Sequence, residues 1–111
     1  MRDTIDDAKT AAYILWENSC CDNDLNHWSC VEDIAYYFRN NRIRTLEQIG
    51  KLLRRNREGI IQPIASRIHT HISQGSDLDN WLMAEKLLDN HRWLTAVLEM
   101  ANANLLNSPI L

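Results

Sequence analysis

The chain has 111 residues, of which 45% are hydrophobic. This is enough apolar material for one buried core, so we expect a single domain over residues 1–111. The longest apolar run, at residues 11–16, is far shorter than the roughly 18 residues of a membrane-spanning helix. The acidic first residues also lack the features of a secretory signal, and we expect a cytoplasmic protein without membrane contact.

Apolar residues recur at helical spacing along most of the chain, which contains only three glycines and two prolines. The fold class we expect is therefore all-α, a compact bundle of about five or six short helices.

Two helices are expected in the N-terminal third. The first begins at an N-cap at Asp3 or Thr4 and ends near Asn18. Its expected inward face is Ile5, Ala8, Ala12, Leu15 and Trp16. The second is capped by Asp24 and runs to about Arg39. Its expected inward face is Leu25, Trp28, Val31, Ala35 and Phe38.

Two further helices are expected in the middle of the chain. Residues 45–48 have the Thr-x-x-Gln form of a capping box and predict the start of a short third helix. Its expected inward face is Leu46, Ile49, Leu52 and Leu53. Asn56 can cap a fourth helix that ends at Gly75, with an apolar stripe of Ile60, Ile61, Ile64, Ile68 and Ile72. Pro63 predicts either a kink in this helix or a start only around Gln62.

The last third, at about 76–106, is expected to form a helical hairpin. Ser76 or Asp77 caps its first helix, residues 89–91 interrupt the pattern, and a second helix follows. The expected inward residues are Leu78, Trp81, Leu82, Leu87, Leu88, Trp93, Leu94, Val97, Met100 and Leu105. The surface of Trp81, Trp93, Val97 and Met100 is more apolar than a terminal hairpin needs, which predicts a two-fold homodimer.

Charge is divided unevenly along the sequence. Residues 1–38 hold two basic and eight acidic residues, a net charge of −6. Residues 39–57 hold seven basic residues and one acidic residue, a net charge of +6. The basic segment can bind an acidic partner, or it can neutralise the acidic segment within the fold.

No constellation of catalytic residues is evident. The chain has no nucleophile motif, phosphate-binding glycine loop or His-x-x-x-His spacing, so we expect neither an enzyme nor a cofactor. Cys20, Cys21, His27 and Cys30 are ligand types that zinc prefers. Adjacent cysteines rarely bind one tetrahedral ion, however, and we expect reduced thiols without a metal.

Residues 48–64 resemble the helix-turn-helix of DNA-binding domains. Ile49, Leu53, Ile60 and Ile64 stand where that family has core residues, and Gly50 stands where its helices cross closely. Trp28, Ser29, Glu32 and Asp33 resemble the opening helix of the Myb/SANT-like version, so the similarity covers about residues 28–70. The family's later tryptophans and its turn glycine are replaced, and Pro63 lies inside the expected recognition helix. The resemblance implies a central helix-turn-helix-like unit that binds DNA and regulates transcription.

Two functions remain open at this point. The first is nucleic-acid binding, with phosphate contacts from the basic segment and base contacts from the outward face of the fourth helix. The expected contact residues are Arg42, Arg44, Lys51, Arg54, Arg55, Arg57, Gln62 and Ser66. The second is a protein–protein interaction module, acting as an adaptor, inhibitor or regulatory subunit. An exposed basic stripe favours the first, and a basic patch covered by residues 1–38 favours the second.

Overall fold

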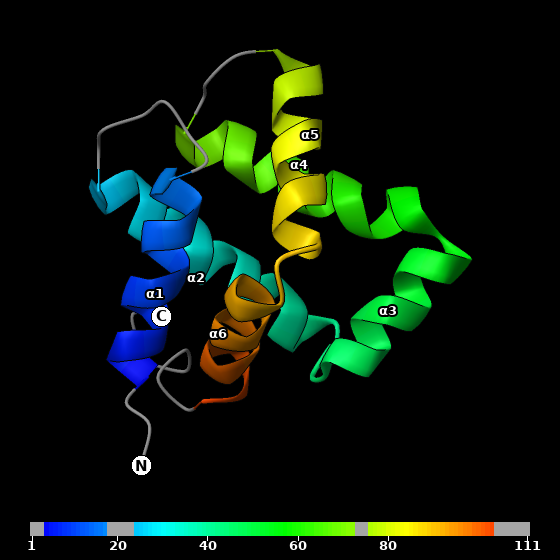
Figure 1. Ribbon diagram of the computed structural model, residues 1–111, viewed down its shortest axis with the longest axis horizontal. Coiled ribbons are helices and arrows are strands. Elements are labelled where there is room, and N and C mark those ends of the chain that lie inside the picture. The colour runs from blue at the N-terminus through cyan, green and yellow to red at the C-terminus, as the bar shows by residue number, and fades with distance from the viewer. Residues whose placement is uncertain (1–3, 18–23, 73–75, 104–111) are drawn as a thin grey trace.

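A computed structural model of the chain describes residues 4–17, 24–72 and 76–103. These residues form six helices and no strand, which confirms the expected all-α fold (Figure 1). The helices are α1 (Thr4–Glu17), α2 (Asp24–Asn40), α3 (Leu46–Arg55), α4 (Arg57–Ile72), α5 (Asp77–Leu88) and α6 (His91–Asn102). Within the described ranges, no helix is both long and apolar enough to cross a membrane.

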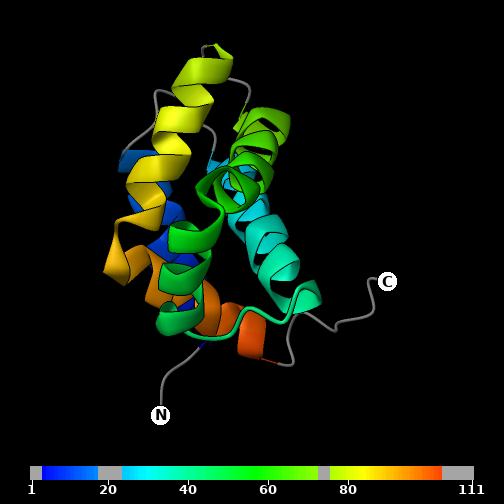
Figure 2. The same ribbon diagram turned by 90° about the vertical axis from the view of Figure 1, so that its right-hand side faces the viewer.

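The centre of the fold is a group of three helices, α1, α2 and α6, which all pack against one another. Helix α4 joins this group by packing on α2, and α5 in turn packs on α4. Leu15, Phe38, Ile64 and Trp93 are fully buried and come from four different helices, so the core is continuous through these layers. Helix α3 touches only α4 and α6 to any extent and forms the outer edge, at the right of Figure 1 and the front of Figure 2.

Helix boundaries in the second half follow the expected capping residues. The capping box of Thr45 and Gln48 is present, and Ser76 caps α5 with a second box. In that box Ser76 donates to Asp79 from its backbone N–H and its hydroxyl, and these hydrogen bonds lower the pKa of Asp79. Asn90 caps α6, so the expected interruption is confirmed at residues 89 and 90, while His91 is the first residue of α6.

A single residue, Asn56, separates α3 from α4. Its Oδ1 accepts a hydrogen bond from the N–H of Gly59 at 3.1 Å, as expected of an N-cap. The Asn56 side chain occupies the space that a Cβ at residue 59 would need, which explains glycine there. Helix α4 then continues through Pro63 to Ile72, so the alternative that it starts only around Gln62 is wrong. The expected isoleucine stripe is buried throughout, and this packing offsets the one backbone hydrogen bond that proline cannot donate.

Four residues expected to face inward are exposed instead. They are Trp16, Leu46, Leu78 and Leu82, with exposed fractions from 37% to 63%. Leu78 and Leu82 are exposed because α5 buries another of its faces. That buried face includes Asn80, Met83, Ala84 and Leu87. The side chains of Ile5 and Leu25, and residues Asp3, Gly75 and Leu105, lie outside the described part.

The surface expected to form a homodimer is inside the molecule. Trp93, Val97 and Met100 are each 3% exposed or less, and Trp81 is half-buried. The reason is that α6 packs on α1 and α2, while α5 packs mainly on α4 rather than on α6. The apolar residues of the expected hairpin therefore complete the core of a single chain.

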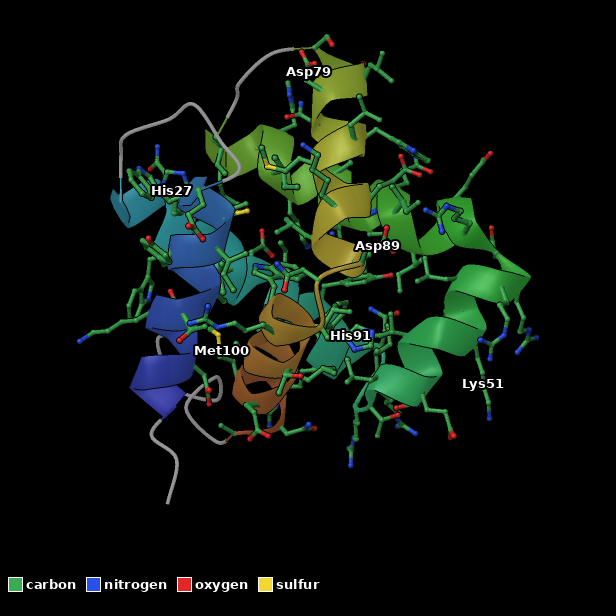
Figure 3. All side chains as sticks on the ribbon, viewed as in Figure 1. His27, Lys51, Asp79, Asp89, His91 and Met100 are labelled. Atoms are coloured by element: carbon green, nitrogen blue, oxygen red, sulfur yellow. The ribbon has the colours of Figure 1, made fainter. Side chains whose placement is uncertain are left out.

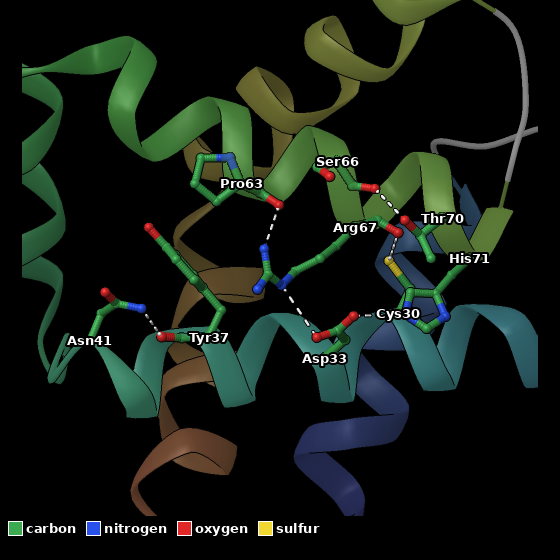
Figure 4. A network of polar contacts seen from close by, with 9 residues as sticks. All are labelled: Cys30, Asp33, Tyr37, Asn41, Pro63, Ser66, Arg67, Thr70 and His71. Carbon is green, nitrogen blue, oxygen red and sulfur yellow. Dashed lines mark hydrogen bonds and ion pairs between the residues drawn. The ribbon is translucent and has the colours of Figure 1, made fainter.

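A cluster of polar contacts links α4 to α2 (Figure 4). Asp33 pairs with Arg67 through one oxygen at 3.2 Å and with His71 through the other at 2.9 Å. The Arg67 guanidinium also lies over the Tyr37 ring, 4.7 Å from its centroid. Burial raises the pKa of the Tyr37 hydroxyl, and the positive charge of Arg67 partly opposes this. These contacts fix which face of α4 is turned towards α2.

Candidate nucleic-acid interface

Six exposed basic residues gather at the outer edge formed by α3 and the residues on either side of it. We call this set the basic edge, and all its members are exposed: Arg42, Arg44, Lys51, Arg54, Arg55 and Arg57. In Figure 3 Lys51 points away from the other helices. The basic edge includes every expected phosphate-contacting residue.

Helix α3 separates its charged and apolar sides. At about 100° per residue, Arg54, Lys51 and Arg55 fall within an arc of about 100°. Ile49 and Leu53 lie on the opposite side, where Ile49 is the only fully buried residue of the helix. Packing of the apolar side on α4 and α6 thus turns the three cations outward.

Few acidic groups neutralise the basic edge. Lys51 lies 3.9 Å from Glu47, and Arg57 pairs with Glu85 of α5 at 3.1 Å. Among the described residues, the side chains of the other four members form no ion pair. The Lys51–Glu47 pair is exposed and contributes little to stability, and the Arg57–Glu85 pair is half-exposed. With two acidic partners for six cations in the described part of the chain, the edge keeps a net positive potential.

The acidic N-terminal helix does not cover the basic edge. Helix α1 lies on the far side of the molecule from α3 (Figure 1). Only Arg39 of the basic segment is drawn into the fold, where its guanidinium donates to the carbonyl of Ala103 at 2.9 Å. The described helix α1 and the basic edge therefore lie on separate surfaces.

The loop before α3 is held in a defined shape. At the end of α2, the N–H of Ile43 donates to the carbonyl of Phe38 and the N–H of Arg42 donates to that of Arg39, as in a Schellman motif. Arg42 has a φ of 58°, the left-handed conformation that this motif usually gives to glycine. The Gln48 side chain accepts from the N–H of Arg44 at 2.7 Å and donates to the carbonyl of Arg42 at 3.2 Å.

The expected base-reading residues lie apart from the basic edge. Gln62 and Ser66 are exposed, but they line a groove between α4 and α5. The α4 helix packs on α2 on one side and on α5 on another, so α5 flanks its exposed face. The single residue between α3 and α4 is also shorter than the three or four residues of a helix-turn-helix turn. The structure thus differs from the arrangement that the resemblance implies.

The groove contains residues that the sequence analysis did not assign to a binding site. His69 of α4 and Asp77, Asn80 and Trp81 of α5 line it with Gln62 and Ser66. The spacing within each helix is visible in the sequence, since Asp77, Asn80 and Trp81 stand at i, i+3 and i+4. The pairing of α5 with α4 rather than α6 is not visible there.

The cysteine and histidine cluster is only partly described. Cys20 and Cys21 lie outside the described residues, while His27 and Cys30 are buried in α2. Burial raises the pKa of the Cys30 thiol to about 12, which disfavours the thiolate that a metal needs. The described part of the chain contains no group of three or more potential metal ligands.

Comparisons with protein-family models, with curated proteins and with solved structures find no match to this chain.

Proposed function

We propose that the protein binds nucleic acid through the basic edge, chiefly by contacts to backbone phosphates. The observation that supports this is the exposure of six cations on one rim of the molecule, four of them without an acidic partner among the described residues. Arginine side chains present planar donor groups that match phosphate oxygens. The proposal does not require α4 to act as a recognition helix, since phosphate contacts carry no sequence information.

The salt dependence of binding tests this proposal. Replacing Arg54 and Arg55 together by Ala should weaken binding to duplex DNA of any sequence. The substitutions should not unfold the protein, because neither side chain is part of the core. Each lost phosphate contact should lower the slope of log affinity against log salt by about 0.9 for a duplex, or about 0.7 for a single strand. Fluorescence anisotropy over a salt series measures both quantities.

Lys9→Ala provides the matched control. Lys9 is exposed like the two arginines, but it belongs to α1 on the other side of the molecule. This variant should bind with the affinity and the salt slope of the original protein. If the folded protein binds no nucleic acid at low salt, or if the control lowers the slope as much as the arginine variant does, the proposal fails.

A second candidate function is a protein–protein interaction module. Tyr13 and Trp16 are exposed on α1 with their ring centroids 5.8 Å apart, beside a pocket of about 390 Å³. Exposed aromatic side chains next to a pocket are typical of binding surfaces for proteins. Replacing both by Ala should leave nucleic-acid binding intact, while a loss of partner binding in this variant, measured by calorimetry with a purified partner, would favour the second function.

A further inference from the structure

A groove of about 320 Å³ runs between α4 and α5. One wall consists of Gln62, Ala65, Ser66 and His69, and the other of Asp77, Asn80 and Trp81. Each set follows the i, i+3, i+4 spacing of one helix face, so the two faces meet across the groove. The small side chain of Ala65, which is almost fully buried, leaves room between the walls.

Asn80 is an unusual residue in this groove. Its side chain is only 2% exposed, and its Nδ2 lies 3.3 Å from Nδ1 of His69. Its Oδ1 has no hydrogen-bond partner among the described residues. A buried amide with an unfilled acceptor position reduces stability, and such exceptions in a folded protein call for a structural or functional reason.

Trp81 supplies a flat apolar surface beside these polar groups. Its indole is half-buried and packs against the core, while it also lines the groove. Sites for unstacked bases combine an aromatic plane for stacking with polar groups that bind the edge of the base, and this groove has side chains of both kinds.

The groove and the basic edge are both built partly on α4. Arg57 is the first residue of α4 and lies five residues before Gln62, about 7.5 Å along the helix axis. Its salt bridge to Glu85, one turn beyond Trp81, links α4 to α5.

We infer that the groove between α4 and α5 takes one base of a single-stranded nucleic acid, stacked on Trp81. This inference rests on the proposed function and specifies its ligand, because the faces of the bases in a duplex are covered by their neighbours. Gln62 and Ser66 then contact the edge of the base. The Asp77 carboxylate accepts hydrogen bonds from an exocyclic amino group, so adenine and cytosine bind better than thymine.

Two single strands of equal length test this inference, one with bases and one made of abasic units that keep the phosphates. The original protein should bind the strand with bases about tenfold more tightly, in keeping with the strength of base–aromatic stacking. Trp81→Leu should remove this difference, whereas Trp81→Phe should keep most of it. Gln62→Ala combined with Ser66→Ala changes only exposed residues and should reduce the difference without affecting the fold. DNA and RNA versions run in parallel show which sugar is preferred.

The outcomes separate this inference from the proposed function. Equal affinity for both strands overturns the base site and leaves phosphate binding by the basic edge intact. If neither strand binds, the proposed function fails, and titration with free adenosine, which has no phosphate, decides the groove alone. A shift of the Trp81 indole N–H resonance that is larger with adenosine than with thymidine supports the site. An unchanged resonance overturns it.

Discussion

Arg42, a member of the basic edge, has a left-handed backbone conformation that lowers the stability of the fold. Its positive φ completes the Schellman motif that ends α2 and turns the chain towards α3. A residue with a Cβ is disfavoured in this conformation by about 1–2 kcal/mol, and glycine is not. The exposed arginine side chain thus gains charge for the edge at the expense of stability.

Substitution of Arg42 separates these two effects. Arg42→Gly should raise the free energy of unfolding by about 1 kcal/mol, because the backbone strain is relieved. Arg42→Ala should leave stability nearly unchanged, because alanine keeps the Cβ. Both variants should weaken nucleic-acid binding equally. Urea unfolding gives the stabilities, and a gain in stability with alanine equal to that with glycine would contradict the argument.

At the scale of elements, the meeting of α3 and α4 differs from the arrangement that the helix-turn-helix resemblance implies. The resemblance places a glycine at residue 50 so that two helices can cross closely. A Cβ built at Gly50 meets only the guanidinium of Arg54, at 3.6 Å, which is ordinary van der Waals contact. No close crossing explains this glycine.

Gly50→Ala should therefore stabilise the protein. Alanine favours the helix over glycine by about 1 kcal/mol, and the free energy of unfolding should rise by roughly this amount. Gly59→Ala is the matched control, because the Asn56 side chain already fills the space of its Cβ and no gain is expected. Thermal unfolding compares the two. Loss of stability in Gly50→Ala would indicate a close helix crossing at this position.

At the scale of the whole molecule, the apolar residues of α6 are buried in the core of a single chain. Val97→Ala should lower the free energy of unfolding by about 2 kcal/mol, since the removed methyl groups lie in the core. Leu78→Ala changes a side chain that is 63% exposed and should alter stability by less than about 0.5 kcal/mol. Neither substitution should change the molecular mass measured by light scattering. Dissociation of a dimer by Val97→Ala would show that Val97 lies in an interface.

The sequence was sufficient to predict the local features of the fold. The caps at Thr45, Asn56 and Ser76 depend on neighbouring residues alone, and the isoleucine stripe of α4 follows from helical periodicity. The face that a helix buries depends on its partners instead. Leu82 is exposed because α5 packs on α4 through another face, and this pairing is a long-range choice.

The candidate site also has one part that could be predicted from local sequence and one part that depends on long-range packing. Clustering of the basic edge could be predicted, because its members are close in sequence and α3 has a single apolar side. The groove could not be predicted, because it joins Gln62 and Ser66 to Asn80 and Trp81 across two helices. Local patterns do not reveal that Asn80 is buried beside His69.

The sparse attachment of α3 has a dynamic consequence. One fully buried side chain and contacts to two helices hold this element, whereas α6 contributes seven buried residues to the core. Helices with few buried contacts open locally at a lower free energy than the rest of a protein. Backbone amides of α3 should thus exchange with deuterium sooner than those of α2 or α6. A ligand bound along its cations would slow that exchange and reveal its footprint in the native state.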